Sequence, residues 1–527
     1  MLIDLQHLPP EATLQSDICI IGGGIAGLVL ADALRGSGLR VDLLEAGGLS
    51  LESRSQALYA ADIIGRPYSG TTDGRFRVFG GSSTRWGGQI LPLADRDFTQ
   101  RSHVPESGWP ISPVDLEPYY ARVESLLGIN HLPYTDRLLS QLPVPRPDGI
   151  ETGLQMRFSK WAPFSQRNLA KTLGQRIKTD PHSKIYYHAN ATHIQLHDRG
   201  QKVEFIATKT YDGRVFRFYS KHFVICAGTV ETSRLLLMSN DIHANGIGNH
   251  HDLVGRYFHD HLSLPAARIV PESRQVFLKR FAPWFLGQTR HTLKLESTAD
   301  FQAESGSLNS MGHFVFDAPD DTAFAWLKQI LQRSQDRTES QPSVPELGLL
   351  SKEFLDLLYL AWQVRVKKRR WSPSRADLML YIDCEQQPNP LSRISLSRER
   401  DALGLPKAAV DWRWGEAERH AMQSYRHLFD RQWHRWNMGK LQWQCNFERS
   451  SNWQTLARDI YHPMGGARMS ADPSRGVVSP NLQLHGIANL HIASCAVFPT
   501  GGSSNPTMTM MAMTLKLADR LKSFEQL

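Results

Sequence analysis

Residues 16–45 read SDICIIGGGIAGLVLADALRGSGLRVDLLE, and this stretch decides the fold. The apolar run at 18–21 is typical of a buried parallel strand. Three glycines follow in GxGxxG spacing, apolar residues then recur with a helical period up to position 34, and a second apolar run at 41–44 leads to Glu45. A strand, a glycine turn, a helix, a second strand and an acid in this order predict a Rossmann-like, dinucleotide-binding unit of the α/β class.

Each glycine of this motif has its own physical task. Gly22 allows a tight turn, Gly24 lets the backbone approach a pyrophosphate, and Gly27 lets the helix pack close to the strand. The amino end of the helix then faces the negative phosphates. Glu45 is placed to accept hydrogen bonds from ribose hydroxyls. The motif by itself does not separate FAD from NAD.

The composition is that of a folded globular protein. The chain has 527 residues, of which 41% are hydrophobic and 21% charged, with a net charge of +8. This length suits roughly two to four domain-sized units. The basic residues are not interleaved with aromatics as in nucleic-acid-binding modules, so we expect no nucleic-acid partner. The five cysteines are odd in number and form no CxxC pair, so we expect neither a metal site nor a disulfide scaffold.

The amino terminus, MLIDLQHLPPEATLQ, lacks the basic head, apolar run and cleavage site of a secretory signal. No apolar run reaches the length of about 18 residues that a transmembrane helix needs. We therefore expect a cytoplasmic protein, with export alongside a signal-bearing partner as the alternative.

A second glycine-rich stretch, RFRVFGGSSTRWGGQI, occupies residues 75–90. Gly80, Gly81, Ser82 and Ser83 could wrap backbone N–H groups and hydroxyls around a phosphate or the edge of a flavin ring. An ordinary loop is the alternative, and this segment alone does not decide between the two.

The carboxyl-terminal part carries two more motifs, YHPMGG at 461–466 and SSNPT at 503–507. In the second, Asn505 followed by Pro506 has the pattern of a helix N-cap followed by a first-turn proline. Apolar residues then recur at helical spacing, at Met508, Met511, Leu515 and Ala518. We predict that Asn505 opens a long buried helix whose positive end points at the cofactor.

In this order along the chain, these motifs resemble the glucose–methanol–choline (GMC) family of flavin oxidoreductases. The resemblance implies FAD as cofactor and oxidation of a CH–OH group to a carbonyl by hydride transfer to flavin N5. It also implies a discontinuous FAD-binding domain and a substrate domain built on an antiparallel sheet flanked by helices. We assign 1–104, 185–261 and 451–527 to the FAD-binding domain, and 105–184 and 262–450 to the substrate-binding domain.

The resemblance extends to single residues. His462 in YHPMGG matches the family's catalytic base, and Asn505 in SSNPT matches the partner that holds the substrate oxygen. A neutral imidazole can accept the alcohol proton, and an amide can hold the oxygen without competing for that proton. A core histidine and a simple helix cap are the alternatives, but two ordered motifs argue against them. The residues expected at FAD are Gly22, Gly24, Gly27, Glu45, Gly80, Gly81, Ser82, Ser83, Thr192, Ala227, Gly228, Ser494 and Pro506.

Two features are similar to the fructose-dehydrogenase-like and pyranose-oxidase-like branch of the family. Ser494 stands where many members have an aspartate, and the segment 385–406 has a similar pattern. In the pyranose-oxidase-like branch, a histidine of the glycine-rich loop carries FAD covalently. Arg85 stands at this position, and an arginine cannot form that bond. We therefore expect non-covalent FAD.

The expected substrate is a sugar, a glycoside or a polyol-like alcohol. The electron acceptor, whether oxygen, a quinone or a cytochrome or other acceptor protein, is not identified by the sequence. A lipid or sterol-like alcohol is the alternative, because apolar segments and a basic run in 322–371 could rest on an anionic membrane, together with Phe281, Trp284, Phe285 and Leu286. An ordinary amphipathic helix with a solvated basic end would also explain 322–371. A non-catalytic flavoprotein subunit is the alternative of another class.

Overall fold

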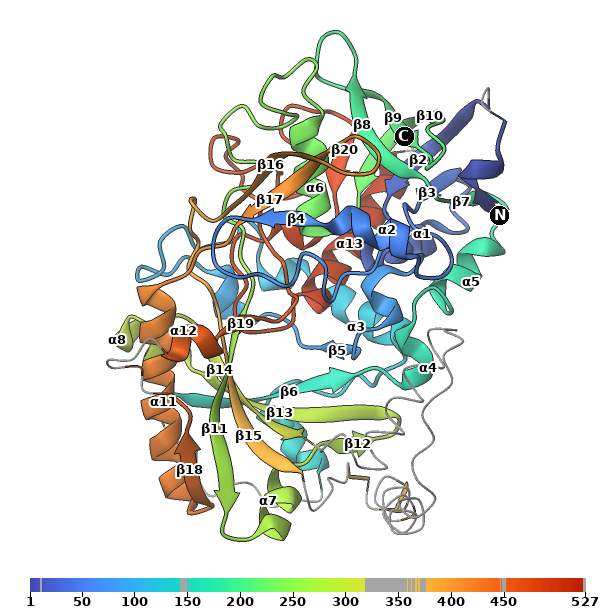
Figure 1. Ribbon diagram of the computed structural model, residues 1–527. Coiled ribbons are helices and arrows are strands. Elements are labelled where there is room, and N and C mark those ends of the chain that lie inside the picture. Colours follow the sequence, from blue (N-terminus) through green and yellow to red (C-terminus); the bar gives the residue numbers. More distant parts are fainter. Residues whose placement is uncertain are drawn as a thin grey trace.

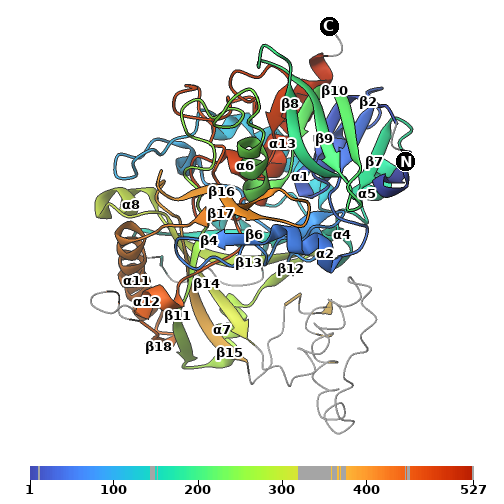
Figure 2. The same cartoon turned by 45° about the horizontal axis from the view of Figure 1, so that its top comes forward.

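The computed structural model describes residues 1–9, 12–142, 149–150, 152–317, 358, 362, 365–366, 368–369, 376–445, 447 and 452–524. Figure 1 shows one sheet in the upper part of the molecule, a second, twisted sheet in the lower part, and a small third sheet between them. Figure 2 shows the same three layers with the upper part turned forward. The mixed arrangement of sheets and helices confirms the predicted α/β fold class.

The first sheet is built around the predicted strand–helix–strand unit. β2 (Leu14–Ile21) pairs in parallel with β3 (Val41–Leu44) on one side and with β10 (Val215–Ile225) on the other. Ile21 lies beside the last residues of both neighbours, so the carboxyl ends of three strands meet at one edge. The other strands of this sheet are β1 (Leu2–Asp4), β7 (Ser183–Tyr187), β8 (Asn190–Leu196), β9 (Val203–Lys209) and β20 (Leu490–Ile492).

Glycines shape the turn from β2 into α1 (Ile25–Leu34) as predicted. Gly22 has a φ of 112°, a conformation that L residues with a Cβ rarely adopt. A Cβ on Gly27 would lie 1.9 Å from the carbonyl oxygen of Gly22. Only glycine therefore permits this close approach of helix to strand, which confirms the packing role predicted for Gly27.

The carboxyl-terminal helix, α13 (Thr507–Phe524), packs against α1 and against α3 (Glu117–Leu126). Its apolar side is buried, as the spacing of the methionines and leucines predicts. The helix begins one residue later than expected, because the carbonyl of Pro506 accepts the first helical bond from Met510 at 3.0 Å. Pro506 rather than Asn505 is therefore the cap residue, and this part of the prediction was wrong.

The second sheet is antiparallel, with the order β18-β11-β15-β14-β13-β6-β5. The long helix α11 (Glu416–Trp436) covers its apolar face, next to β14 and β15. Two of its short strands, β5 and β19, come from ranges assigned above to the FAD-binding domain, and the domain division stays a prediction. The strands are β5 (Gln89–Ile90), β6 (Leu154–Trp161), β11 (Leu262–Pro271), β12 (Trp284–Leu286), β13 (Thr289–Ser297), β14 (Ser310–Asp317), β15 (Asp377–Cys384), β18 (Gly439–Trp443) and β19 (Arg458–Asp459).

The third sheet joins β4 (Ala61–Ile63) to the hairpin of β16 (Arg393–Arg400) and β17 (Pro406–Asp411). This hairpin packs against α6 (Gly228–Met238), the helix that follows β10. The remaining α-helices of the described residues are α2 (Ser53–Gln56), α4 (Phe164–Arg167), α5 (Leu173–Lys178), α7 (Arg274–Phe281), α8 (Ala299–Ser305) and α12 (Asn452–Leu456).

The segment 322–371 lies outside the described residues except at six positions, so the membrane contact expected there stays a prediction. Of the four residues expected to join that contact, Phe281 and Trp284 are buried in the core of the second sheet, with 1% and 3% of their surface exposed, and Trp284 pairs with Arg369 of the segment. These two side chains are not available to a membrane, and that part of the expectation is corrected, whereas Phe285 and Leu286 are half-buried. Within the described part of the chain, no helix has both the length and the apolar character needed to cross a bilayer.

Candidate active site

A cavity of about 690 Å³ connects the amino-terminal glycine motif with the two carboxyl-terminal motifs. Gly22, Gly24 and Glu45 line one part of it, at the carboxyl edge of the first sheet. His462 and Asn505 line another part. Residues that are far apart in the sequence thus meet in one hollow, at the edge where ligands of open α/β sheets bind.

The amino end of α1 opens toward this cavity. Gly24 is the residue before the first turn of α1, and a Cβ placed on it would meet no atom within 4 Å. A Cβ would project into the space that a phosphate group needs, where helix N–H groups favour negative charge. Gly81 closes on the same point, since its Cβ would lie 2.9 Å from Cα of Gly24.

Glu45 is buried directly after β3, beside the glycine turn. Its carboxylate accepts the backbone N–H of Gly23 at 3.0 Å and that of Gly47 at 2.7 Å. Burial raises the pKa of Glu45, while these hydrogen bonds and the charge of Arg77 act in the opposite direction. Two carboxylate oxygens have about four acceptor sites, so capacity for ribose hydroxyls remains.

Arginine side chains surround the half-buried carboxylate of Glu231 on α6. Arg75 and Arg234 approach it with nitrogen–oxygen distances of 3.2 Å each, and Arg77 lies at 3.9 Å. Burial acts to raise the pKa of Glu231, but the positive charges of Arg234 and Arg75 hold it below its ordinary range. Arg234 also pairs with Asp401 at 2.5 Å. These charges all line the cavity.

The turn between β16 and β17 also lines this part of the cavity, with Asp401, Leu403 and Leu405. This turn lies in the range 262–450, which was assigned to the substrate-binding domain, and its contact with the cavity was not expected. Only the packing of the hairpin against α6 brings the turn here.

The predicted residues of the second glycine-rich loop have two different roles: some line the cavity and others hold the shape of the loop. Gly81 and Ser82 line the cavity, whereas Gly80 and Ser83 do not. The hydroxyl of Ser83 donates to the carbonyl of Gly80 at 2.6 Å and accepts the N–H of Leu169 at 3.2 Å. Ser83 therefore holds the loop in shape, and Ser82 and Gly81 present it to the cavity.

The strands of the first sheet place the remaining predicted residues. Ala227, Gly228 and Ser494 line the cavity. Thr192 does not, because its hydroxyl donates to a main-chain carbonyl of β9 at 3.2 Å. The preceding residues, 189–191, line the cavity instead.

His462 and Asn505 lie in contact. Nδ2 of Asn505 is 3.2 Å from Nε2 of His462, and Pro506 lines the cavity beside them. Tyr461, directly before the histidine, has a φ of 64°, a strained conformation of the kind that clusters at functional sites. Burial lowers the pKa of His462 to about 3, so the imidazole is neutral at pH 7.

The other ring nitrogen of His462 contacts a second buried histidine, His261. The two Nδ1 atoms are 3.0 Å apart and the rings are nearly perpendicular, at 88°. Nε2 of His261 lies 2.8 Å from the carbonyl oxygen of Gly502 and 3.4 Å from that of Gly501. Burial also lowers the pKa of His261. A chain of contacts therefore runs from Gly502 through both histidines to Asn505.

Asp260 anchors the backbone beneath these rings. Its carboxylate accepts the N–H of His462 at 2.9 and 3.1 Å and the N–H of His261 at 2.7 Å. The hydroxyl of Tyr68 also donates to it, at 2.9 Å. Burial, together with the charge of Asp459, raises the pKa of Asp260 to about 8. One carboxyl group thus fixes the backbone positions of both histidines relative to each other.

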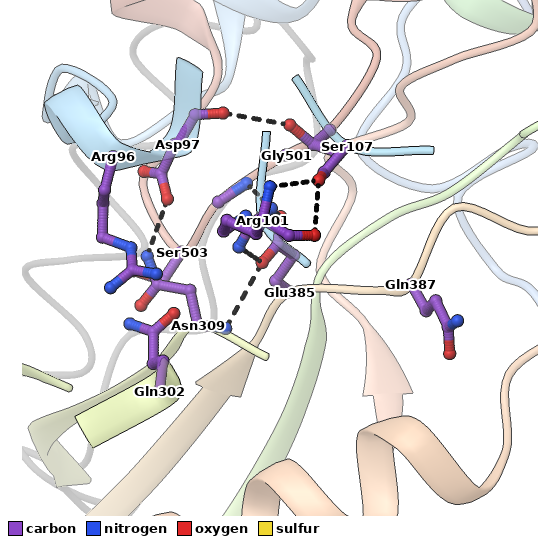
Figure 3. A network of polar contacts seen from close by, with 12 residues as sticks. Arg96, Asp97, Arg101, Ser107, Gln302, Asn309, Glu385, Gln387, Gly501 and Ser503 are labelled. Atoms are coloured by element: carbon purple, nitrogen blue, oxygen red, sulfur yellow. Dashed lines mark hydrogen bonds and ion pairs between the residues drawn. The ribbon is translucent and has the colours of Figure 1, made fainter. Parts of the chain in front are cut away.

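The loop that carries Asn505 rests on a buried polar network, shown in Figure 3. Glu385 accepts the N–H of Gly502 at 3.2 Å, and both of its oxygens face the guanidinium of Arg101, at 2.6 and 2.7 Å. Asn309 donates its backbone N–H to the same carboxylate at 3.3 Å. This two-point contact with arginine is directional and holds the loop from below.

A second buried ion pair holds the next two residues of the loop. The hydroxyl of Ser503 donates to Glu296 at 2.7 Å, and the hydroxyl of Ser504 accepts from Arg157 at 3.2 Å. Arg157 and Glu296 face each other at 3.4 Å. Residues 502–504 are thus all tied to buried charged side chains, which leaves Asn505 little freedom to move away from His462.

The face of the second sheet that is turned toward this site is polar. Asp383 accepts a hydrogen bond from Ser263 at 2.7 Å, and it lies 3.1 Å from His313 and 3.6 Å from Lys294. The charges of Asp383 and Lys294 act on the pKa of His462, so the cluster lies close to the pair. On the same face, Gln89 and Trp161 line the cavity.

Sequence reasoning missed His261, Asp260 and Glu385 as functional residues. The first two directly precede β11, and Glu385 opens the segment 385–406. An Asp-His pair directly before an apolar stretch was the one available signal. Nothing in the sequence relates that pair to a histidine 201 positions away.

Models of two protein families match most of the chain. Residues 17–334 match the FAD dependent oxidoreductase model, and residues 388–514 match the GMC oxidoreductase model. The fructose dehydrogenase large subunit of Gluconobacter japonicus is 24% identical, over 97% of this chain and 98% of its own. The 2-methyl-1,2-propanediol dehydrogenase of Mycolicibacterium austroafricanum is 22% identical, over 96% and 95%. Among solved structures, pyridoxine 4-oxidase from Mesorbium loti has the same fold, with a TM-score of 0.57, 17% identity and coverage of 96% and 98%.

Proposed function

Since the chain belongs to the GMC family of FAD-dependent oxidoreductases, whose members oxidise CH–OH groups, we propose that His462 is the base of its alcohol oxidation and that Asn505 holds the substrate oxygen. The observation that carries this proposal is the contact of the neutral His462 imidazole with the Asn505 amide at 3.2 Å, inside the cavity.

The cavity has the features that FAD requires. The open Cβ directions of Gly24 and Gly228, both of which line it, leave room for a ligand against the backbone. Gly24 and the N–H groups of α1 would hold the pyrophosphate, and Glu45 would accept from the ribose. Bound FAD supplies the hydride acceptor of the reaction.

His462 and Asn505 divide the work on the substrate hydroxyl. Without substrate, the amide of Asn505 donates to Nε2 of His462. A substrate hydroxyl lying beside both groups would donate its proton to Nε2 in place of the amide and accept from the second N–H of Asn505. The oxygen is then held while its proton leaves. A neutral base with a lowered pKa is ready over a wide pH range.

We further propose a hydroxyl-rich substrate, such as a sugar, a glycoside or a polyol. The sheet face beside the pair carries the charged and hydroxyl groups of Asp383, Lys294, His313 and Ser263, and Gln89 on the same face lines the cavity, so this side of the site is polar. A polar wall of this kind suits a substrate with several hydroxyls better than the apolar chain of a lipid alcohol. Relatives whose names include fructose and a propanediol agree with this choice.

FAD is proposed to be bound without a covalent link. Arg85 lines the cavity at the end of the glycine-rich loop, where the resemblance places a flavin-linked histidine in the pyranose-oxidase-like branch. A guanidinium cannot form that bond. Precipitation of the protein in acid should therefore leave a yellow supernatant, whereas a yellow pellet would contradict this part of the proposal.

The test of the base is anaerobic reduction of the purified holoenzyme by a panel of sugars, polyols and lipid alcohols. His462→Ala should retain FAD and lose about 10²–10⁴-fold in the rate of flavin bleaching. His427→Ala, at an exposed position on α11, is the matched control and should be unchanged. An unchanged rate in His462→Ala would remove this residue from the mechanism. Addition of oxygen, a quinone or cytochrome c to the reduced enzyme then identifies the acceptor.

A further inference from the structure

We propose that His261 is a positioning residue that fixes the tautomer of His462, so that the lone pair of the base lies on Nε2 and faces Asn505. This inference rests on the proposed role of His462 as the base. It assigns a task to a residue that does not itself line the cavity.

At one end of this chain of contacts, chemistry fixes which atom donates the hydrogen bond and which accepts it. A carbonyl oxygen can only accept, so Nε2 of His261, 2.8 Å from the oxygen of Gly502, must carry the hydrogen. A neutral imidazole has one N–H, and therefore Nδ1 of His261 holds a lone pair. His261 is 1% exposed, which disfavours a second proton on this ring.

The donor and acceptor nitrogens of His261 then determine those of His462. Nδ1 of His462 lies 3.0 Å from Nδ1 of His261 and must donate to that lone pair. Nε2 of His462 is then without hydrogen, and it accepts from Nδ2 of Asn505 at 3.2 Å. The carbonyl of Gly502 thus determines, through His261, which nitrogen of His462 is basic.

The same loop meets both ends of this chain. Gly502 supplies the carbonyl at one end, and Asn505, three positions later, supplies the amide at the other. Glu385 holds the N–H of Gly502, so the carbonyl is held in place by the buried network described above. The loop that carries the second motif therefore both orients the base and holds the substrate oxygen.

His261 does not act as a proton exit. A proton passed from His462 would have to leave from Nε2 of His261, and the atoms next to this nitrogen are the carbonyl oxygens of Gly502 and Gly501. Neither oxygen carries a proton onward. The role of His261 is therefore orientation of the base, as a third group orients the histidine of a catalytic triad.

Two amide substitutions at His261 separate this role from a merely structural one. His261→Asn places an amide near the position of Nδ1, where its oxygen can accept from His462, but loses the donor to Gly502. His261→Gln places an amide near the position of Nε2, which keeps the donor to Gly502 but removes the acceptor for His462. If His261 sets the tautomer, the Gln variant should lose about 10- to 10²-fold in kcat and the Asn variant clearly less. FAD content and KM should change little in either.

If His261 only supported the loop, the order would be reversed, because the Gln variant keeps the contact with Gly502. That result would overturn the proposal. Equal losses in the two variants would also overturn it.

The direct readout is ¹⁵N NMR of histidine-labelled holoenzyme, with the His462 signals assigned by their loss in His462→Ala. Nε2 of His462 should be unprotonated in the wild type and in His261→Asn, and partly protonated in His261→Gln. A protonated Nε2 in the wild type, or no change in His261→Gln, would disprove the tautomer assignment. This readout is independent of turnover, so a base other than His462 would appear in the His462→Ala rate without altering the NMR result.

Discussion

Glu385 and Gly502 are joined by a hydrogen bond in which the buried carboxylate accepts the backbone N–H at 3.2 Å. The same carboxylate is paired with Arg101 in two-point geometry. The contact connects the second sheet to the loop of the second motif, and through that loop it supports Asn505 and the contact of Gly502 with His261.

Removal of this charge should destabilise the fold. In Glu385→Gln, Arg101 loses its closest counter-charge inside the protein, and breaking a buried ion pair of this kind costs about 3 kcal/mol. We expect a lower urea midpoint for the holoenzyme. Glu399→Gln, which removes an exposed partner of Lys407, is the control and should leave the midpoint unchanged. Equal midpoints for both variants would show that the network does not stabilise the loop.

The glycines of the first motif should separate folding from cofactor binding. Gly27→Ala would place a methyl group 1.9 Å from the carbonyl oxygen of Gly22, and we expect little folded protein. Gly24→Ala meets no protein atom within 4 Å and should fold. Its methyl group would occupy ligand space, so FAD should bind at least about 10-fold more weakly, or about 1.4 kcal/mol. Circular dichroism of the apoprotein and FAD titration measure the two effects, and tight FAD binding by Gly24→Ala would contradict the assignment.

The lowered pKa of His462 predicts an unusual pH profile. The ordinary pKa of histidine is 6.5, and burial lowers that of His462 to about 3, so the base stays neutral from pH 8 down to pH 5. The profile of kcat/KM should therefore show no acid limb near pH 6.5. The same shift also makes the free energy of unfolding depend on pH. The unfolded chain takes up a proton near 6.5 and the folded one only near 3, so the contribution present above pH 6.5 is lost as the pH falls toward 3. A limb at pH 6–7 that disappears in His462→Ala would refute the shift.

A carboxylate at position 505 should introduce an acid limb into the pH profile of kcat/KM. In Asn505→Asp, a negative charge about where Nδ2 lies, 3.2 Å from Nε2, would stabilise the protonated imidazole. We expect the pKa of His462 to rise by roughly one to three units, so that kcat/KM falls more at pH 5 than at pH 8. Asn505→Ala adds no charge and is the control, with a loss that does not depend on pH. Parallel profiles for the two variants would exclude electrostatic coupling between the two residues.

The dinucleotide unit could be predicted in detail because its determinants are local. Gly22, Gly27 and the apolar runs around them act on neighbours within about 30 residues. The cap of the last helix was misplaced by one residue, and here the determinant is not local. Asn505 has the residue type of a cap, but its amide is engaged by His462 instead of by the helix.

The sequence by itself determined the α/β class, the glycine turn, and the two motifs that carry His462 and Asn505. Each of these depends on residue types at short spacing. Only the tertiary structure decided that His261 lies against His462, that Glu385 supports Gly502, and that Thr192 does not line the cavity. These contacts join segments separated by up to 201 positions. They are set by which strands pair and how two sheets face each other, and no periodicity within a single segment encodes that pairing.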